Sequence, residues 1–268
     1  MPNSLMGNKD GGNFLTKTTM KADKDLQFLQ YCKNDDLVTL CNILTNDNKG
    51  GYRFTEQLTS TDNYINYYPQ EMNKMWADIA WELQCYGGNT LLNVFMRHGK
   101  GPAYEEIVSD VCRKIKVSGP RHADTTQMEA QLLGKVIDKA LSQMSEQELR
   151  NLCDELNLSY ADKLPKSAIM TTLALTHQIS IKMYMYLLRI ILTFVERCLI
   201  SRGVIICTGL ALTRPLSLLL GPIGVAILIG MTVWDIMGPA YRVTIPAVIQ
   251  VALMRMEYMA SLEKKEAI

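Results

Sequence analysis

The sequence predicts an all-α fold: a multi-helix bundle with a hydrophobic helical hairpin, interrupted by glycine and proline, in its C-terminal third. Apolar residues recur at helical spacing along most of the chain, whereas β-branched residues gather in only two short runs, at 204–207 and 243–245. Aromatic residues form only 7% of the chain and methionine reaches 16 residues, which favours packed helices over a β-sandwich. The hairpin is predicted from residues 203–254, a stretch of 52 residues with three charges.

The N-terminal part divides into a polar tail and a helical domain. Residues 1–22 are rich in Gly, Asn, Thr and Lys and predict a disordered tail. A helical domain follows over 23–118. Asn34 can cap a helix in which the apolar residues Leu37, Leu40, Cys41 and Leu44 share one face.

Two further helices are expected in this domain. The first carries an apolar stripe from Met72 to Leu83 and ends at a Gly-Gly pair, and we expect its Asp78 and Glu82 to be solvated. The second begins at Pro102, a residue that suits the first turn of a helix, and carries apolar residues as far as Ile115.

Residues 119–180 form a helical middle region. A helix is expected from about 126 to 144, and Ser145 with Glu148 then forms a capping box that opens the next helix. A long helical pattern starts at Lys166 and becomes steadily more apolar towards Cys198.

Residues 181–260 form the hydrophobic helical region, and 261–268 a charged tail. Gly221-Pro222 divides the apolar stretch into a hairpin of two helices, at 203–220 and 223–237. The uncharged run that ends at Trp234 spans 20 residues, which as a helix would cover roughly 30 Å, the thickness of a bilayer core.

Two charges in this stretch bear on a membrane location. Arg214 lies inside the expected segment, where an arginine at the bilayer centre costs about 2.5–3.5 kcal/mol. Pairing with Asp235 would reduce that cost. The alternative is a helical core buried in a soluble domain, with Arg214 and Asp235 at its rim.

Composition and motifs exclude several classes of function. The net charge is +1 and basic residues are not clustered, so we expect no nucleic-acid partner. The seven cysteines are scattered without a CxxC motif, which is typical of reduced, buried thiols, and the first 30 residues lack an apolar signal core. No metal-binding or nucleotide motif occurs, so we expect no enzyme, no cofactor and no metal. Arg97, His98 and Lys100 could contact an anion, but a simple helix stop explains the same loop.

Three segments resemble the YaaW-like family of uncharacterised bacterial proteins. They are WELQCYGGNT at 81–90, KIKV at 114–117 and GPAYRVTIPAVIQ at 238–250, and the resemblance runs from about Asp23 to Met256. It implies a bacterial source, a mostly α-helical fold and a remote grouping with the ubiquinol–cytochrome c chaperone domain. In the last segment, Tyr241 and Arg242 lie between a Gly-Pro pair and a second proline. In a membrane protein this arrangement is typical of the interface, whereas in a soluble protein the two side chains would satisfy backbone groups that the prolines free.

We therefore expect a non-enzymatic helical protein of the bacterial cytoplasm, associated with the inner membrane and with an unidentified protein partner. A chaperone or assembly role for a membrane complex fits this description. The alternatives are a membrane-inserting, pore-forming protein and a soluble bundle that binds a lipid or small ligand. The residues expected to contact the membrane or the partner are Arg214, Gly221, Pro222, Trp234, Asp235, Tyr241 and Arg242.

Overall fold

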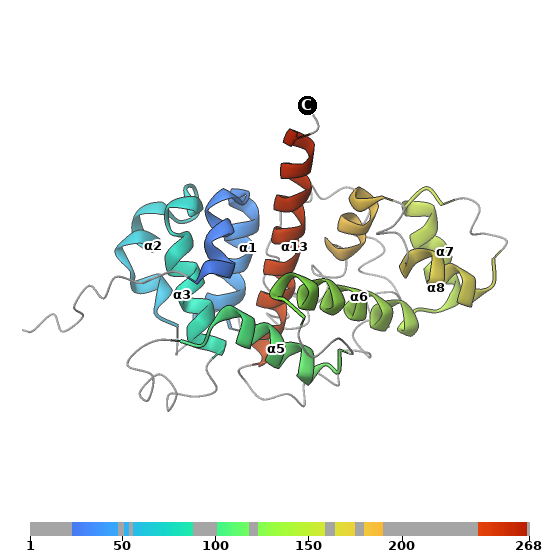
Figure 1. The fold of residues 1–268 in the computed structure, drawn as a ribbon, viewed down its shortest axis with the longest axis horizontal. Coiled ribbons are helices and arrows are strands. Elements are labelled where there is room, and N and C mark those ends of the chain that lie inside the picture. The colour runs from blue at the N-terminus through green and yellow to red at the C-terminus, as the bar shows by residue number, and fades with distance from the viewer. Residues whose placement is uncertain are drawn as a thin grey trace, which may run out of the picture.

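In a computed structural model of the chain, the regular elements of the described residues are helices (Figure 1). The described residues are 23–47, 51–53, 56–87, 101–117, 123–158, 164–174, 180–189 and 241–266. Among them, the only extended pairing is an isolated bridge between Asn46 and Tyr52. The predicted all-α class is confirmed, whereas the predicted hairpin at 203–237 lies outside the described residues.

The helices follow one another along the chain as short 3₁₀ segments and longer α-helices. They are η1 (Lys24–Tyr31), α1 (Asn34–Thr45), η2 (Leu58–Ser60), α2 (Asp62–Tyr67), η3 (Met72–Lys74), α3 (Trp76–Gly87), α5 (Tyr104–Lys114), α6 (Thr125–Gln143), α7 (Glu146–Glu155), α8 (Lys166–Ala174) and α13 (Tyr241–Glu266). A further helix covers residues 181–189.

Local signals place the ends of several helices. The predicted capping box is confirmed at α7, where the Glu148 backbone N–H donates to Ser145 Oγ at 3.3 Å and the Ser145 N–H donates to Glu148 Oε2 at 2.6 Å. The apolar face predicted for α1 is also confirmed, because all four of its residues are fully buried.

Asn34 does not cap α1, contrary to the prediction. It is the first residue of the helix, after Lys33 at the cap position. Its side-chain amide donates to the Pro69 carbonyl at 2.8 Å, and its oxygen accepts the Met72 N–H at 2.9 Å. The side chain therefore ties α1 to the segment before α3, and this long-range pair replaces the local capping bond.

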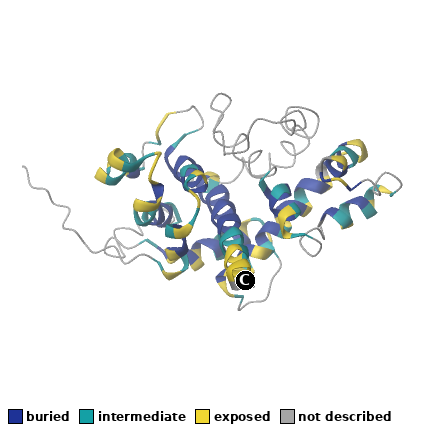
Figure 2. Cartoon of the chain, turned by 90° about the horizontal axis from the view of Figure 1, so that it is seen from above, coloured by how far each residue is buried: buried dark blue, intermediate teal, exposed yellow. Residues whose placement is uncertain are grey.

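Helix α13 stands in the middle of the molecule, with α1, α2 and α3 on one side and α7 and α8 on the other (Figure 1). It packs most extensively against α1 and α6, and also against α5 and α3. Residues 243–254 are all buried, whereas the C-terminal part of the helix is largely exposed (Figure 2). A helix that is apolar on all sides is expected only where other elements surround it.

The burial of α13 separates the end of the apolar stretch 203–254 from the rest of it. Residues 243–254 are core of the folded body and contact its other helices. Pro246 is the sixth residue of α13, and the helix continues past it to Glu266. The segment predicted as a charged tail at 261–268 continues α13 as far as Glu266, with Lys264 and Lys265 in the last turn, where cations are favourable.

Candidate functional site

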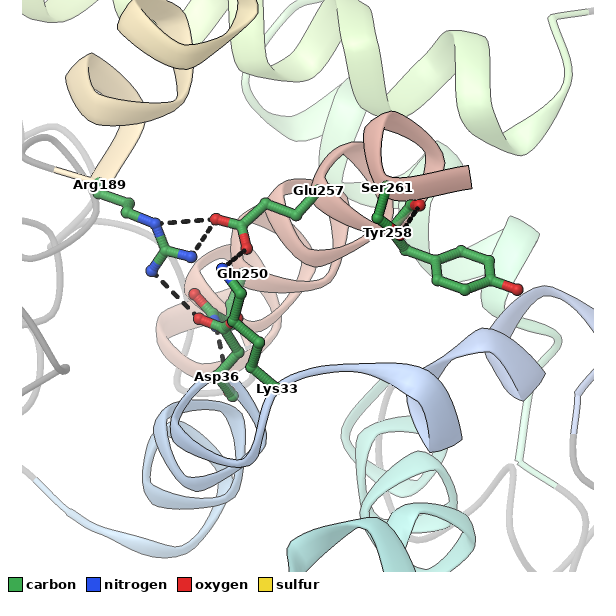
Figure 3. A network of polar contacts seen from close by, with 7 residues as sticks. All are labelled: Lys33, Asp36, Arg189, Gln250, Glu257, Tyr258 and Ser261. Carbon is green, nitrogen blue, oxygen red and sulfur yellow. Dashed lines mark hydrogen bonds and ion pairs between the residues drawn. The ribbon is translucent and has the colours of Figure 1, made fainter. Parts of the chain in front are cut away.

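Helix α13 carries polar side chains that bind elements from distant parts of the chain. On one side of it lies a group that we call the Arg189 cluster: Lys33, Asp36, Arg189, Gln250 and Glu257 (Figure 3). Its members come from the start of α1, from the helix at 181–189 and from α13. Gln250 and Glu257 are seven residues apart, so two helical turns place them on one face.

The Arg189 guanidinium lies between two carboxylates. Its Nη1 donates to Asp36 Oδ1 at 3.1 Å and its Nε donates to Glu257 Oε1 at 2.9 Å, while Nη2 also bonds Glu257. Lys33 Nζ donates to the other oxygen of Glu257 at 2.7 Å. The Gln250 amide donates to the Asp36 carbonyl at 3.1 Å. The cluster thus fixes three helices with charge-assisted hydrogen bonds, the stronger class of such bonds.

Burial and charge act in opposite directions on the two carboxylates. Burial raises the pKa of Asp36, and the charge of Arg189 only partly offsets this. Burial alone would also raise the pKa of Glu257, but hydrogen bonds from Lys33 and Arg189 outweigh it and hold that pKa below its usual value. Glu257 is therefore the carboxylate that the cluster keeps charged.

A second group, the Arg255 cluster, lies on another side of α13 and consists of Tyr104, Glu129 and Arg255 with the η1 residues Asp25 and Phe28. Arg255 Nε donates to Glu129 Oε2 at 2.6 Å, and its Nη2 donates to the Asp25 carbonyl at 2.6 Å. The Tyr104 hydroxyl donates to Glu129 Oε1 at 2.8 Å. The guanidinium carbon lies 4.2 Å from the Phe28 ring centroid, a cation–π contact.

Glu129 is almost fully buried in this cluster. Burial raises its pKa, while Arg255 and the Tyr104 hydroxyl oppose the change. The pKa of Tyr104 is raised well above its usual value, first by its own burial and then by the charge of Glu129. The hydroxyl therefore stays protonated and donates its hydrogen bond at all ordinary pH values.

Glu82 on α3 is buried, contrary to the prediction that it is solvated. Its side chain accepts the Gln57 backbone N–H at 3.3 Å, and the residue is only 3% exposed. Burial raises its pKa to about 7, and the charge of Glu56 adds to the effect. Asp78, four residues earlier, is partly exposed and accepts a hydrogen bond from Asn63 at 2.7 Å.

Of the residues predicted to contact a membrane, a partner or an anion, two lie in the described part of the chain. Tyr241 and Arg242 form the first turn of α13, and Lys114 Nζ lies 5.0 Å from the centroid of the Tyr241 ring. Arg242 is exposed. The other residues predicted to contact a membrane, a partner or an anion lie outside the described residues: Arg97, His98, Lys100, Arg214, Gly221, Pro222, Trp234 and Asp235.

Sequence reasoning did not select either cluster. Gln250 offered a signal, because a lone amide within the apolar run of α13 needs a hydrogen-bond partner once it is buried. Arg189 and Arg255 offered a weaker one, since each follows a mainly apolar stretch. The sequence does not identify the carboxylates that pair with these two arginines. They lie 68 and 153 residues away from Arg189 and 126 residues away from Arg255.

The described residues give both clusters a positioning role. Within the described ranges, no three His, Cys, Asp or Glu side chains are grouped so that they could hold a metal ion. None of the helices in those ranges is both long enough and apolar enough to cross a membrane. The clusters instead fix α13 against helices drawn from both halves of the chain.

Comparisons with known proteins give one consistent result. The chain is 37% identical over 249 residues to a UPF0174 protein of Helicobacter pylori strain J99, covering 92% of this chain and 97% of that protein. It is 30% identical over 238 residues to the UPF0174 protein YaaW of Escherichia coli K12, covering 87% of this chain and 94% of the relative. A domain of unknown function, DUF3944, matches residues 20–54. No solved structure matches the chain.

Proposed function

Because the chain belongs to the UPF0174 family, the YaaW-like proteins of bacteria, we propose that it is a non-enzymatic protein that attaches to a membrane through residues 203–237 and helps to assemble a membrane complex. The helical body is the part that a partner protein would bind. The remote grouping with the ubiquinol–cytochrome c chaperone domain is part of this proposal and rests on the resemblance of the sequence alone.

The proposal rests mainly on how the body holds both sides of the apolar segment. Arg189, shortly before the segment, bonds Asp36 and Glu257. Tyr241, just after it, starts the buried helix α13 and contacts Lys114. The chain between these two points contains the run of 20 uncharged residues from Pro215 to Trp234. Flanks that are both held by one folded body suit a hairpin whose two ends stay on one side of a bilayer.

The burial of α13 determines how this proposal is tested. A chain that ended at Arg202 would lose α13 and with it the centre of the core. We therefore propose an internal deletion in which a Gly/Ser linker replaces residues 203–237, so that both clusters keep their residues. Circular dichroism and thermal melting check that this variant folds.

Carbonate extraction of bacterial membranes then compares the full chain with the deletion. We expect the full chain to stay with the membranes and the deletion to be released. Release of both proteins would overturn the proposal, and so would retention of both, because residues 203–237 would then not be the anchor. Dye release from liposomes on addition of the full chain would favour a pore-forming protein instead.

The assembly role has a separate test. Membranes from cells with and without the gene are compared on native gels, followed by cross-linking of the full chain to its neighbours. We expect at least one membrane complex to be depleted in the cells without the gene. In cells with the gene, the same complex should cross-link to the helical body. A gel pattern that does not change would refute the assembly role and leave the membrane attachment standing.

A further inference from the structure

A cavity of about 620 Å³ lies among the C-terminal end of α5, α6 and α8. Its volume is in the range of sites that hold small ligands. The apolar part of its lining is Ile115, Leu141 and Met170, one residue from each segment. Neither polar cluster of α13 contributes to it, so this cavity is separate from the candidate site described above.

Three lysines and one aspartate give the cavity its charge. Lys116, Lys135 and Lys139 contribute three positive charges and Asp138 one negative charge, which leaves a net charge of +2. Lys135 and Lys139 are four residues apart on α6 and therefore lie side by side, an arrangement in which like charges repel. Burial lowers the pKa of Lys139, and the charge of Lys135 lowers it further. An anion between the two ammonium groups would relieve this repulsion.

Lys116 occupies a backbone position that normally favours glycine. It follows α5 with φ 58°, in the left-handed region. The Val117 N–H donates to the Cys112 carbonyl at 2.9 Å and the Lys116 N–H to the Arg113 carbonyl at 3.3 Å, the pattern of a Schellman motif. The equivalent position after α7 is Asn157, with φ 56°, a residue type that tolerates this conformation. Lys116 thus lines the cavity from a backbone conformation that is unfavourable for lysine.

The two hydroxyl groups of the lining already donate their hydrogens elsewhere. Ser142 Oγ donates to the Lys139 carbonyl at 2.8 Å, and Thr171 Oγ1 donates to the Ser167 carbonyl at 3.0 Å. Each lysine ammonium group carries three N–H donors and can bond a ligand in addition to a partner in the protein. Donors with positive charge and no acceptor capacity suit an anion with several oxygen atoms.

The cavity is connected through α5 to the start of α13. Lys114, two residues before Lys116, lies over the ring of Tyr241, the first residue after the segment that we propose to contact the membrane. Basic residues close to a membrane-contacting segment are attracted to the anionic phosphates of lipid headgroups.

We propose that this cavity binds a phosphate group, with Lys116, Lys135 and Lys139 as its hydrogen-bond donors. The phosphate belongs to a lipid headgroup or to free phosphate in solution. The lipid form of this inference rests on the proposed function, because only a body attached to a membrane would meet headgroups. The apolar lining from three segments of the chain would contact the glycerol side of a lipid.

The test uses the full chain and two single variants, Lys116→Gly and Lys264→Gln. Glycine favours the left-handed conformation at position 116, so we expect Lys116→Gly to fold at least as well as the natural chain. Lys264→Gln removes one charge at the exposed end of α13, where it lines no part of the cavity, and serves as the matched control. Thermal melting verifies that both variants are folded.

Two binding measurements separate the two sources of phosphate. Flotation uses vesicles of phosphatidylcholine with and without phosphatidylglycerol, and calorimetry uses inorganic phosphate. A lysine near an anionic surface contributes about 1 kcal/mol, so we expect Lys116→Gly to reduce binding to the phosphatidylglycerol vesicles about fivefold. Lys264→Gln should change that binding by less than about twofold, because its charge lies outside the cavity and salt screens it.

Each outcome bears on the proposal. A loss confined to Lys116→Gly supports a lipid headgroup if it appears in the vesicle measurement, and free phosphate if it appears in calorimetry. Equal loss in both variants, or no loss in either measurement, overturns the phosphate site. A third outcome is possible: the full chain binds no vesicles but binds inorganic phosphate, and Lys116→Gly loses that binding. In this case the proposed membrane attachment fails while the phosphate site stands.

Discussion

Replacing Glu82 with glutamine should change how the stability of this protein depends on pH. Glu82 is 3% exposed, its carboxylate accepts the Gln57 backbone N–H, and its pKa is about 7 because burial disfavours the charged form. In the unfolded chain the same group titrates at its ordinary value of 4.5. Between these two values the unfolded chain gains a charge that the folded protein resists, so the free energy of unfolding falls.

The size of the effect follows from the gap between the two pKa values. The contribution of Glu82 to stability is complete below pH 4.5 and is lost as the pH rises to about 7. Each pH unit in this interval costs about 1.4 kcal/mol, so the loss at pH 8 is about 3 kcal/mol. Glutamine keeps an oxygen that can accept the Gln57 N–H and carries no charge at any pH, so Glu82→Gln should not show this loss.

Thermal melting of the full chain and of Glu82→Gln at pH 5 and pH 8 measures the difference. As the pH rises, we expect the melting temperature of the variant to increase relative to that of the natural chain, by roughly 2–4 °C for each kcal/mol that the natural chain loses. Glu263→Gln, at the exposed end of α13, is the control and should follow the natural chain. A difference between Glu82→Gln and the natural chain that does not change between pH 5 and pH 8 would show that Glu82 is ionised in the folded protein.

Three further substitutions test particular contacts by thermal melting. Gly134→Ala should raise stability by about 0.5–1 kcal/mol, because the added methyl meets nothing within 4 Å in the interior of α6; a loss would reveal a contact there. Gly87→Ala should lower it by about 1–3 kcal/mol, because its Cβ would lie 2.2 Å from Ile107 Cγ1, and an unchanged melting temperature would mean that the Ile107 side chain repacks without cost. Arg189→Met should lower it by about 2–3 kcal/mol, because Asp36 stays buried without its guanidinium partner; a neutral result would show that this ion pair is not needed for stability.

The sequence determined the elements of this protein wherever the signal is local. The all-α class, the apolar face of α1 and the capping box at Ser145 depend on residues three or four positions apart, which a helix brings together whatever surrounds it. Such signals survive in the folded protein where no tertiary contact competes for the same groups. Asn34 is an exception, since the Pro69 carbonyl and the Met72 N–H compete successfully for its side chain.

The tertiary structure alone decided what surrounds each helix. An apolar run such as 243–254 has the same sequence pattern whether lipid or protein covers it. Its packing against α1 and α6 is what makes it a core helix. Glu82 has the residue type of a solvated side chain, yet the segment that carries Gln57 buries it. Arg189 meets Asp36 across 153 residues of sequence. No local pattern encodes these pairings, because they depend on how distant helices are placed in space.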